Sequence, residues 1–251
     1  MNIIIFSKDR AMQLDALFQT IARYLPFTYN IAVVFKASNA SFAAGYARLM
    51  SRAGPIAWLH ESNFRSQVLS CLSSDNEYTM LECDDSMFFG PAWFTGLADH
   101  VLCHSLRLGR NTTLCYPTSQ SQRIPQDFPV WRYRDAEADF AYPFSTTGHI
   151  YRTKDLFDIM DARGWSSPNT LEASMVGAQS WRPFMTAPVR SCSVCIPHNK
   201  VQNDFPNREE GGNPDKLNDL FLAGRRIRPF AMDFSQVPAA HWPVPFVFTE
   251  K

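Results

Sequence analysis

The sequence predicts an α/β protein built on an open mixed sheet flanked by helices. Three observations support this prediction. Short apolar runs alternate with amphipathic stretches over the first half of the 251-residue chain. These runs are continuous rather than alternating, which is typical of strands covered on both faces. Each run ends in a polar segment, and open α/β sheets bind ligands at the carboxyl ends of their strands.

Strand and helix patterns follow one another through the first half. Residues 2–6 form a continuous apolar run, and residues 11–24 carry apolar side chains at helical spacing until Pro26 ends the helix. The other elements expected here are strands at 31–35, 56–59 and 78–82 and helices at 42–52 and 64–73. Because four strands end in polar residues, we expect those ends to converge on one crevice.

The second half of the chain is less regular. The patterns predict helices over 92–108, 152–162, 168–178 and 216–223, strands over 113–117 and 191–197, a long loop over 118–143, and a polar, mobile loop over 203–215. The tail from 224 is rich in arginine, proline and aromatic residues. It fits either packing on the body of the protein or contact with an anionic membrane or a partner subunit.

Composition excludes several classes of protein. Lysine plus arginine and aspartate plus glutamate both number 24, so no net charge favours nucleic acid. No apolar run of about 18 residues predicts a membrane-spanning helix. The N-terminus reads as a strand and not as a signal peptide, so we expect a cytoplasmic chain with six reduced cysteines. Cys192 and Cys195 form a single C-x-x-C, without the second pair that zinc needs.

The stretch 78–89 is the most informative part of the chain. An apolar run ends in Glu82, Asp84 and Asp85, and a second apolar segment begins at Met87. Carboxylates at the end of a buried strand need a cation or hydrogen-bond donors. A divalent metal carrying a phosphorylated ligand meets that need. An acidic, helix-capping turn is the alternative reading.

These pieces, in this order, resemble the GT-A glycosyltransferases, particularly the family 2 type. The resemblance rests on the acidic motif Leu81-Glu82-Cys83-Asp84-Asp85, followed by Pro91, and on the opening Phe6-Ser7-Lys8-Asp9-Arg10, followed by Gln13 and Leu14. Glu82 stands where the family usually has aspartate. The resemblance implies a catalytic domain over 1–205, with a nucleotide-binding half (1–110) and an acceptor half (111–205). Residues 206–251 are then a mobile loop and C-terminal tail.

The resemblance also implies roles for individual side chains. It makes Asp84 the direct ligand of a divalent metal, Mn²⁺ or Mg²⁺, with Asp85 the second choice and His198 a further ligand. The residues it assigns to the donor are Ser7, Lys8, Asp9, Arg10, Arg65, Glu82 and His149. A structural histidine is the alternative for His149, and surface or turn residues are the alternatives for the others.

An inverting transferase needs a general base to take a proton from the acceptor hydroxyl. In the family this is a carboxylate near the start of a helix in the second half. Glu172 fits best, because Asn169 or Thr170 as N-cap places it in the first turn of a helix. Asp155 is the second choice. For both, a carboxylate favoured by the helix dipole is the alternative reading.

The implied activity is metal-dependent, inverting transfer of a sugar from a nucleotide-diphosphate donor, a UDP-sugar by analogy. The implied acceptor is a glycan or lipid-linked glycan of polysaccharide biosynthesis. A non-catalytic nucleotide- or sugar-binding module is an alternative. A sugar-phosphate nucleotidylyltransferase fits less well, because residues 7–11 lack the glycines that cradle a triphosphate. A metal-dependent hydrolase lacks its clustered histidines. The oligomeric state is left open.

Overall fold

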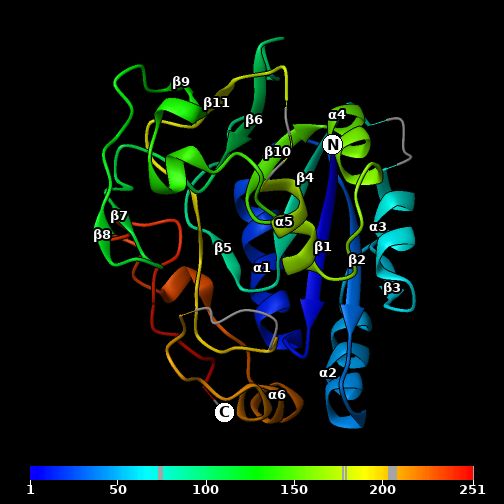
Figure 1. Cartoon of the computed structure of the whole chain (residues 1–251). Coiled ribbons are helices and arrows are strands. Elements are labelled where there is room, and N and C mark those ends of the chain that lie inside the picture. The colour runs from blue at the N-terminus through cyan, green and yellow to red at the C-terminus, as the bar shows by residue number, and fades with distance from the viewer. Residues whose placement is uncertain (73–75, 177, 179, 203–207, 251) are drawn as a thin grey trace.

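The structure, a computed structural model, describes residues 1–72, 76–176, 178, 180–202 and 208–250. It contains an eight-stranded mixed sheet with helices on both faces (Figure 1), so the predicted open α/β sheet is confirmed. Part of the expected mobile loop, residues 203–207, lies outside the described residues. The same holds for residues 206 and 207 of the proposed C-terminal segment.

The sheet has a parallel half and a mixed half. Its strand order is β3 (Ala57–His60), β2 (Asn30–Lys36), β1 (Asn2–Lys8), β4 (Tyr78–Cys83), β10 (His149–Arg152), β6 (Val101–Ser105), β11 (Phe184–Thr186) and β9 (Val130–Arg132). The first four strands are parallel, whereas β10 runs antiparallel to both β4 and β6. The carboxyl ends of the parallel strands therefore meet at one edge, toward the bottom of Figure 1.

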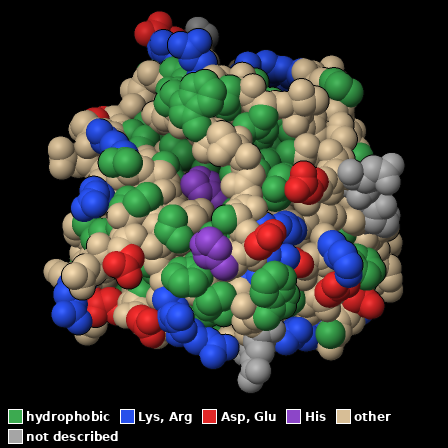
Figure 2. All heavy atoms as spheres, turned by 90° about the horizontal axis from the view of Figure 1, so that it is seen from above, with side chains coloured by type: hydrophobic (Ala, Val, Ile, Leu, Met, Phe, Trp, Pro, Cys, Tyr) green, Lys and Arg blue, Asp and Glu red, His purple; other side chains and the backbone are tan. Residues whose placement is uncertain are grey.

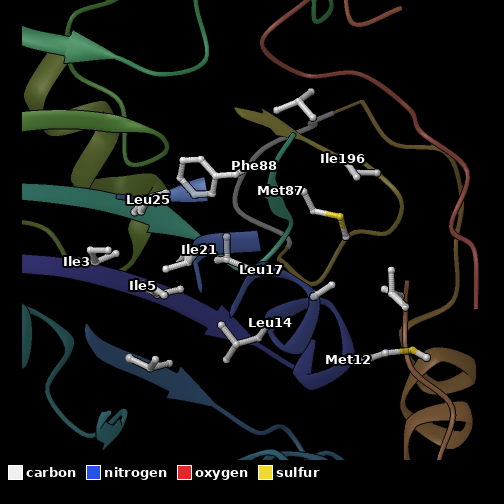
Figure 3. Close-up of a cluster of buried hydrophobic side chains, with 14 of the residues drawn as sticks. Ile3, Ile5, Met12, Leu14, Leu17, Ile21, Leu25, Met87, Phe88 and Ile196 are labelled. Atoms are coloured by element: carbon white, nitrogen blue, oxygen red, sulfur yellow. The ribbon is translucent and has the colours of Figure 1, made fainter. Parts of the chain in front are cut away.

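Alternation along β1 explains why helices cover both faces. Ile3 and Ile5 point into one apolar cluster, and Ile4 and Phe6 point into the other. The helices of the first cluster are α1 (Ala11–Tyr24), α2 (Ala40–Met50) and α6 (Pro214–Leu222). Those of the second are α3 (Phe64–Leu72), α4 (Thr153–Asp161) and α5 (Pro168–Val176). Figure 3 shows β1 and α1 meeting β5 (Ser86–Phe88) in the first cluster.

Short elements complete the described chain. β5 pairs with β12 (Ser193–Cys195), and β7 (Leu114–Cys115) pairs with β8 (Gln120–Ser121). The 3₁₀ helices are η1 (Tyr133–Asp135), η2 (Ala138–Ala141) and η3 (Pro229–Ala231). The β5–β12 pair brings the chain near residue 195 back beside the acidic end of β4, because Ile196 N–H donates to the Asp85 carbonyl at 2.8 Å.

The predicted helix over 92–108 is wrong. Gly96 has a φ of +118°, which interrupts a helix, and residues 101–105 form β6 in the interior of the sheet. Val101, Leu102 and Cys103 are buried, and a short apolar run of this kind has no periodicity that separates strand from helix. The expected loop over 118–143 contains β8, β9 and two 3₁₀ helices instead.

The C-terminal tail packs on the body of the protein. Arg226 forms a two-pronged ion pair with Asp15 of α1, with distances of 2.7 Å from Nε and 2.8 Å from Nη2. Ile227, Val237 and Val244 belong to the core cluster that contains α1. These contacts agree with the first of the two readings, a tail packed on the body, while Arg228 and Phe230 are exposed.

All six cysteines are free thiols, which confirms the expectation from the sequence. Among the described helices, none combines the length and apolar character needed to cross a bilayer. Figure 2 shows basic and acidic side chains scattered over one face without a large patch of either sign. This surface agrees with the zero net charge of the chain.

Candidate active site

A cavity of about 820 Å³ opens at the carboxyl ends of the parallel strands. Ligand pockets of about 300–1,000 Å³ are typical of small-molecule sites. The segments that line it include the β1–α1 turn, the ends of β2 and β4, residues 145–147, the start of α5, Pro197 and residues 199–202. The convergence of polar strand ends on one crevice is thus confirmed for Lys8, Lys36, Glu61 and Asp84.

The turn between β1 and α1 is shaped by Asp9. Its φ of +56° is left-handed, a conformation that aspartate tolerates better than most residues. Its carboxylate accepts hydrogen bonds from Ser38 N–H at 2.7 Å and from Ser38 Oγ at 2.6 Å. Asp9 therefore ties the turn to the end of β2 and leaves Arg10 at the N-cap of α1, facing β4.

Asp84 links the end of β4 to the end of β1, because both of its carboxylate oxygens accept hydrogen bonds from residues 7–10. Oδ2 accepts from Ser7 Oγ at 2.8 Å and from Lys8 N–H at 3.0 Å, and Oδ1 accepts from Arg10 Nη1 at 3.0 Å. Tyr46 supports this arrangement, because its hydroxyl lies 2.6 Å from Ser7 Oγ and accepts from Arg10 N–H at 3.3 Å. Burial raises the pKa of the Asp84 carboxyl, and the Arg10 guanidinium opposes that rise.

Arg10 bridges the two aspartates of the acidic motif. The same Nη1 that donates to Asp84 also donates to Asp85 Oδ2 at 2.9 Å. Nη2 donates to the Asn199 carbonyl, and the Asn199 side chain accepts from Gln13 Nε2 at 2.8 Å. Burial would lower the pKa of Arg10, but the charges of Asp85 and Asp84 raise it further than burial lowers it. The guanidinium is therefore a fixed cation of this site.

The expected metal site can be tested against these contacts. A divalent ion that bridges Asp84 and Asp85 must lie about 2.0–2.6 Å from an oxygen of each. Arg10 Nη1 occupies the space between them, at 3.0 and 2.9 Å. Among the residues that the structure describes, no group of three or more His, Cys, Asp or Glu side chains is placed to hold a metal. The side chains as they stand do not fit a metal ion.

Glu172 lies in the same cavity, on α5. Its Oε2 accepts from Thr146 N–H at 2.7 Å and from Thr146 Oγ1 at 2.8 Å, and Ser145 Oγ lies at 3.4 Å. Its Oε1 accepts from Tyr142 OH at 3.1 Å. The helix begins at Pro168, before the N-cap expected at Asn169 or Thr170, so Glu172 follows the first turn instead of lying within it. These donors hold the Glu172 side chain at the cavity wall.

Glu82 lies beneath the cavity and not in its wall. Its side chain is fully buried, Oε1 accepts from Cys83 N–H at 3.2 Å, and no described residue gives Oε2 a hydrogen bond. Burial raises the pKa of Glu82 to about 7. At this pKa about half of the Glu82 carboxyl groups carry a proton at neutral pH.

The structure brings together some of the predicted site residues and not others. Ser7, Lys8, Arg10, Asp84, Asp85 and Glu172 line the cavity. Asp9 adjoins it and shapes the turn.

Besides Glu82, four predicted residues lie outside the cavity wall and have other partners. Arg65 pairs with Asp161 at 2.8 Å, and Asp155 pairs with Arg182 at 2.6 Å. His149 is buried among Pro143, Cys103 and Tyr151, which fits the structural reading, and burial lowers its pKa. His198 packs against Phe246, with ring centroids 4.6 Å apart.

The cavity also contains residues that sequence patterns did not single out for it. Arg107 is buried at its wall, where its Nη2 donates to Ser145 Oγ at 2.7 Å. His241 also lines it, and the buried His241 Nδ1 has no partner in the described chain. Arg107 could not be assigned to the site from the sequence, because it lies in the segment 92–108 that was wrongly predicted to be a helix. His241 comes from a tail whose packing leaves no periodic signal.

Comparison with models of protein families finds no match. Among curated proteins, the chain is 25% identical over 209 residues to the "Bifunctional glycosyltransferase pgtA" of Dictyostelium discoideum. The alignment covers 68% of this chain and 27% of that protein, so the chain spans about a quarter of its relative's length. This match supports the resemblance that the acidic motif indicated.

Solved structures give partial matches to the backbone of this chain. The crystal structure of S. aureus TarS 1-349 gives a TM-score of 0.45 at 13% identity, covering 77% of this chain and 59% of that one. The mannosyltransferase PcManGT from Pyrobaculum calidifontis, in complex with GDP-Man and Mn²⁺, gives 0.43 at 11% identity, covering 74% and 54%. Likenesses of this size do not by themselves establish a shared fold. Over 209 residues the chain is therefore similar in sequence to a glycosyltransferase, and its open mixed α/β sheet is the kind of sheet that the GT-A resemblance implies.

Proposed function

We propose that the chain is a glycosyltransferase that takes its sugar from a nucleotide-diphosphate donor. The observation that carries this proposal is the single cavity shared by the β1–α1 turn, the acidic end of β4 and Glu172. The sequence match to a curated glycosyltransferase supports the reaction class. A UDP-sugar donor and a glycan or lipid-linked acceptor belong to the same proposal, by resemblance.

The donor's diphosphate would lie at the carboxyl ends of β1 and β4. Lys8 and Arg10 line the cavity there, and Lys200 lines it from the segment that follows β12. Cationic side chains stabilise the negative charge that builds on a diphosphate leaving group. Ser7 and Asp9 support this position indirectly, because one holds Asp84 and the other closes the turn.

Glu172 would act as the general base that takes the proton of the acceptor hydroxyl. A carboxylate oxygen accepts at two positions, and Oε1 receives one hydrogen bond among the described residues, from Tyr142. It therefore keeps a free position for an acceptor hydroxyl. Direct attack assisted by such a base inverts the anomeric centre, which is the expected outcome. Asp155, the second choice, is held by Arg182 outside the cavity wall.

The test is nucleoside-diphosphate release from a panel of UDP- and GDP-sugars, with and without oligosaccharide acceptors. We expect the wild type to consume at least one donor. Glu172→Gln should lower the transfer rate by about 10²–10⁴-fold, the usual contribution of a general base, without weakening donor binding. Glu137→Gln is the matched control, because Glu137 pairs with Arg123 away from the cavity. Donor binding without turnover in the wild type would favour the non-catalytic module.

A further inference from the structure

The guanidinium of Arg10 stands where the acidic motif would otherwise need a metal. One nitrogen, Nη1, is 3.0 Å from Asp84 and 2.9 Å from Asp85. The exposed fractions of the three side chains are 10% for Arg10, 3% for Asp84 and 20% for Asp85. The chain itself thus supplies the cation that the buried Asp84 and the partly buried Asp85 share.

Arg10 is also anchored away from the aspartates. Its Nη2 donates to the Asn199 carbonyl, and Asn199 is held by Gln13 of α1. Its backbone N–H donates to the Tyr46 hydroxyl at 3.3 Å. For the guanidinium to leave, the buried Asn199 carbonyl would lose its charged donor, which is costly for a buried acceptor. An incoming divalent ion would have to displace a fixed cation or lie beside it.

We infer that, in the donor site proposed above, Arg10 replaces a divalent metal and donor binding is metal-independent. The inference rests on the proposed function for the identity of the ligand, a nucleoside diphosphate. Arg10 pairs with both aspartates, and Lys8 adds a second positive charge to the same wall of the cavity. Lys200 then leaves the diphosphate end of the cavity with a net positive charge. The alternative is that the donor binds together with the Mn²⁺ or Mg²⁺ ion expected from the sequence. The two experiments below distinguish these possibilities.

The first experiment measures the affinity for UDP and GDP by titration calorimetry, once in EDTA and once in Mn²⁺. We expect the two dissociation constants to agree within about twofold. Lys8→Gln should weaken binding by roughly tenfold, as for loss of one charge-assisted hydrogen bond. Lys154→Gln, at an exposed pair with Asp158, is the matched control and should leave affinity unchanged. Binding that needs Mn²⁺ overturns the inference and leaves the proposed function standing.

A second experiment needs no nucleotide. Mn²⁺ titration followed by electron paramagnetic resonance should detect no bound ion in the wild type. Arg10→Gln frees Asp84 and Asp85, and so should gain Mn²⁺ binding. If Arg10→Gln does not fold, the wild type and Asp84→Asn still decide. Mn²⁺ bound by the wild type and lost in Asp84→Asn overturns the inference. If neither UDP nor GDP binds in any condition, the proposed function fails. The Mn²⁺ titration would still show whether Arg10 occupies the place of a metal ion.

Discussion

Thr146 donates two hydrogen bonds to the Glu172 carboxylate, one from its backbone and one from its side chain. Its backbone N–H is 2.7 Å and its hydroxyl 2.8 Å from the same oxygen of the carboxylate, Oε2. The loop between η2 and β10 thereby fixes a side chain that projects from α5. Because one residue supplies both donors, the position of Glu172 in the cavity depends on that loop. Thr146 is a positioning residue in this account.

Thr146→Val tests the positioning role. Valine keeps the shape and the backbone N–H but removes the hydroxyl donor. A loosened base costs transition-state stabilisation more than donor binding, so we expect kcat to fall by about tenfold with KM changed by less than about twofold. The steady-state assay with the selected donor measures both. Thr146→Ser restores the hydroxyl and should recover most of the activity. If kcat is unchanged in Thr146→Val, and circular dichroism shows that the variant is folded, then the Thr146 hydroxyl does not position Glu172.

Glu82 predicts a particular dependence of stability on pH. Its folded-state pKa is about 7, above its ordinary value of 4.5, so the folded chain holds this proton more tightly than the unfolded chain does. The stabilisation is complete below pH 4.5 and is lost as pH rises through 7. Glutamine is a neutral isostere. Relative to wild type, Glu82→Gln should therefore gain about 3 kcal/mol in free energy of unfolding between about pH 4.5 and pH 8.

Urea unfolding at several pH values measures this difference. Glu77→Gln, at an exposed position, should alter stability by less than about 0.5 kcal/mol at each pH. A Glu82→Gln profile that runs parallel to wild type would show that Glu82 is ionised in the folded protein. Its burial without a partner for Oε2 would then need another explanation.

The Arg226–Asp15 pair predicts how strongly the tail is held to the body. Asp15 is 5% exposed and Arg226 is 31% exposed, so Arg226→Met leaves a buried carboxylate with Gln19 as its remaining side-chain donor. We expect a loss of about 2 kcal/mol in the free energy of unfolding, below the usual cost for a fully buried pair because Arg226 is partly solvated.

The matched comparison is Arg123→Met, which breaks an exposed pair with Glu137. That pair has exposed fractions of 89% and 42%, and its loss should cost less than about 0.5 kcal/mol. Denaturant unfolding measures both variants. Equal losses for the two would contradict the claim that the tail is anchored at Asp15.

The parallel half of the fold could be predicted from the sequence because its signals are local. Residues 11–24 have clear helical spacing, and α1 has those bounds. β1, β2 and β4 are continuous apolar runs of the kind that parallel strands need. The second half depends on non-local pairing instead. β6 and β11 are short strands whose partners are distant in sequence, and no local pattern identifies them.

The candidate site shows the same division. Asp84, Asp85 and Glu172 could be found because carboxylates at element ends carry a recognisable chemistry. The bridging by Arg10 could not be predicted, because side-chain pairing depends on the conformation of the turn that Asp9 shapes. Arg65 and His149 were expected in the site from their place in the sequence. Arg65 instead pairs with Asp161, and His149 is buried beside Pro143.

The most direct test of the account is a crystal structure of the chain with the nucleotide-sugar that the panel selects. We predict that the diphosphate lies against Lys8 and Arg10 at the ends of β1 and β4, with the sugar toward Glu172. A second cavity, of about 510 Å³, lies between β5 and the tail around η3. A donor lodged there, with the first cavity empty, would contradict the account.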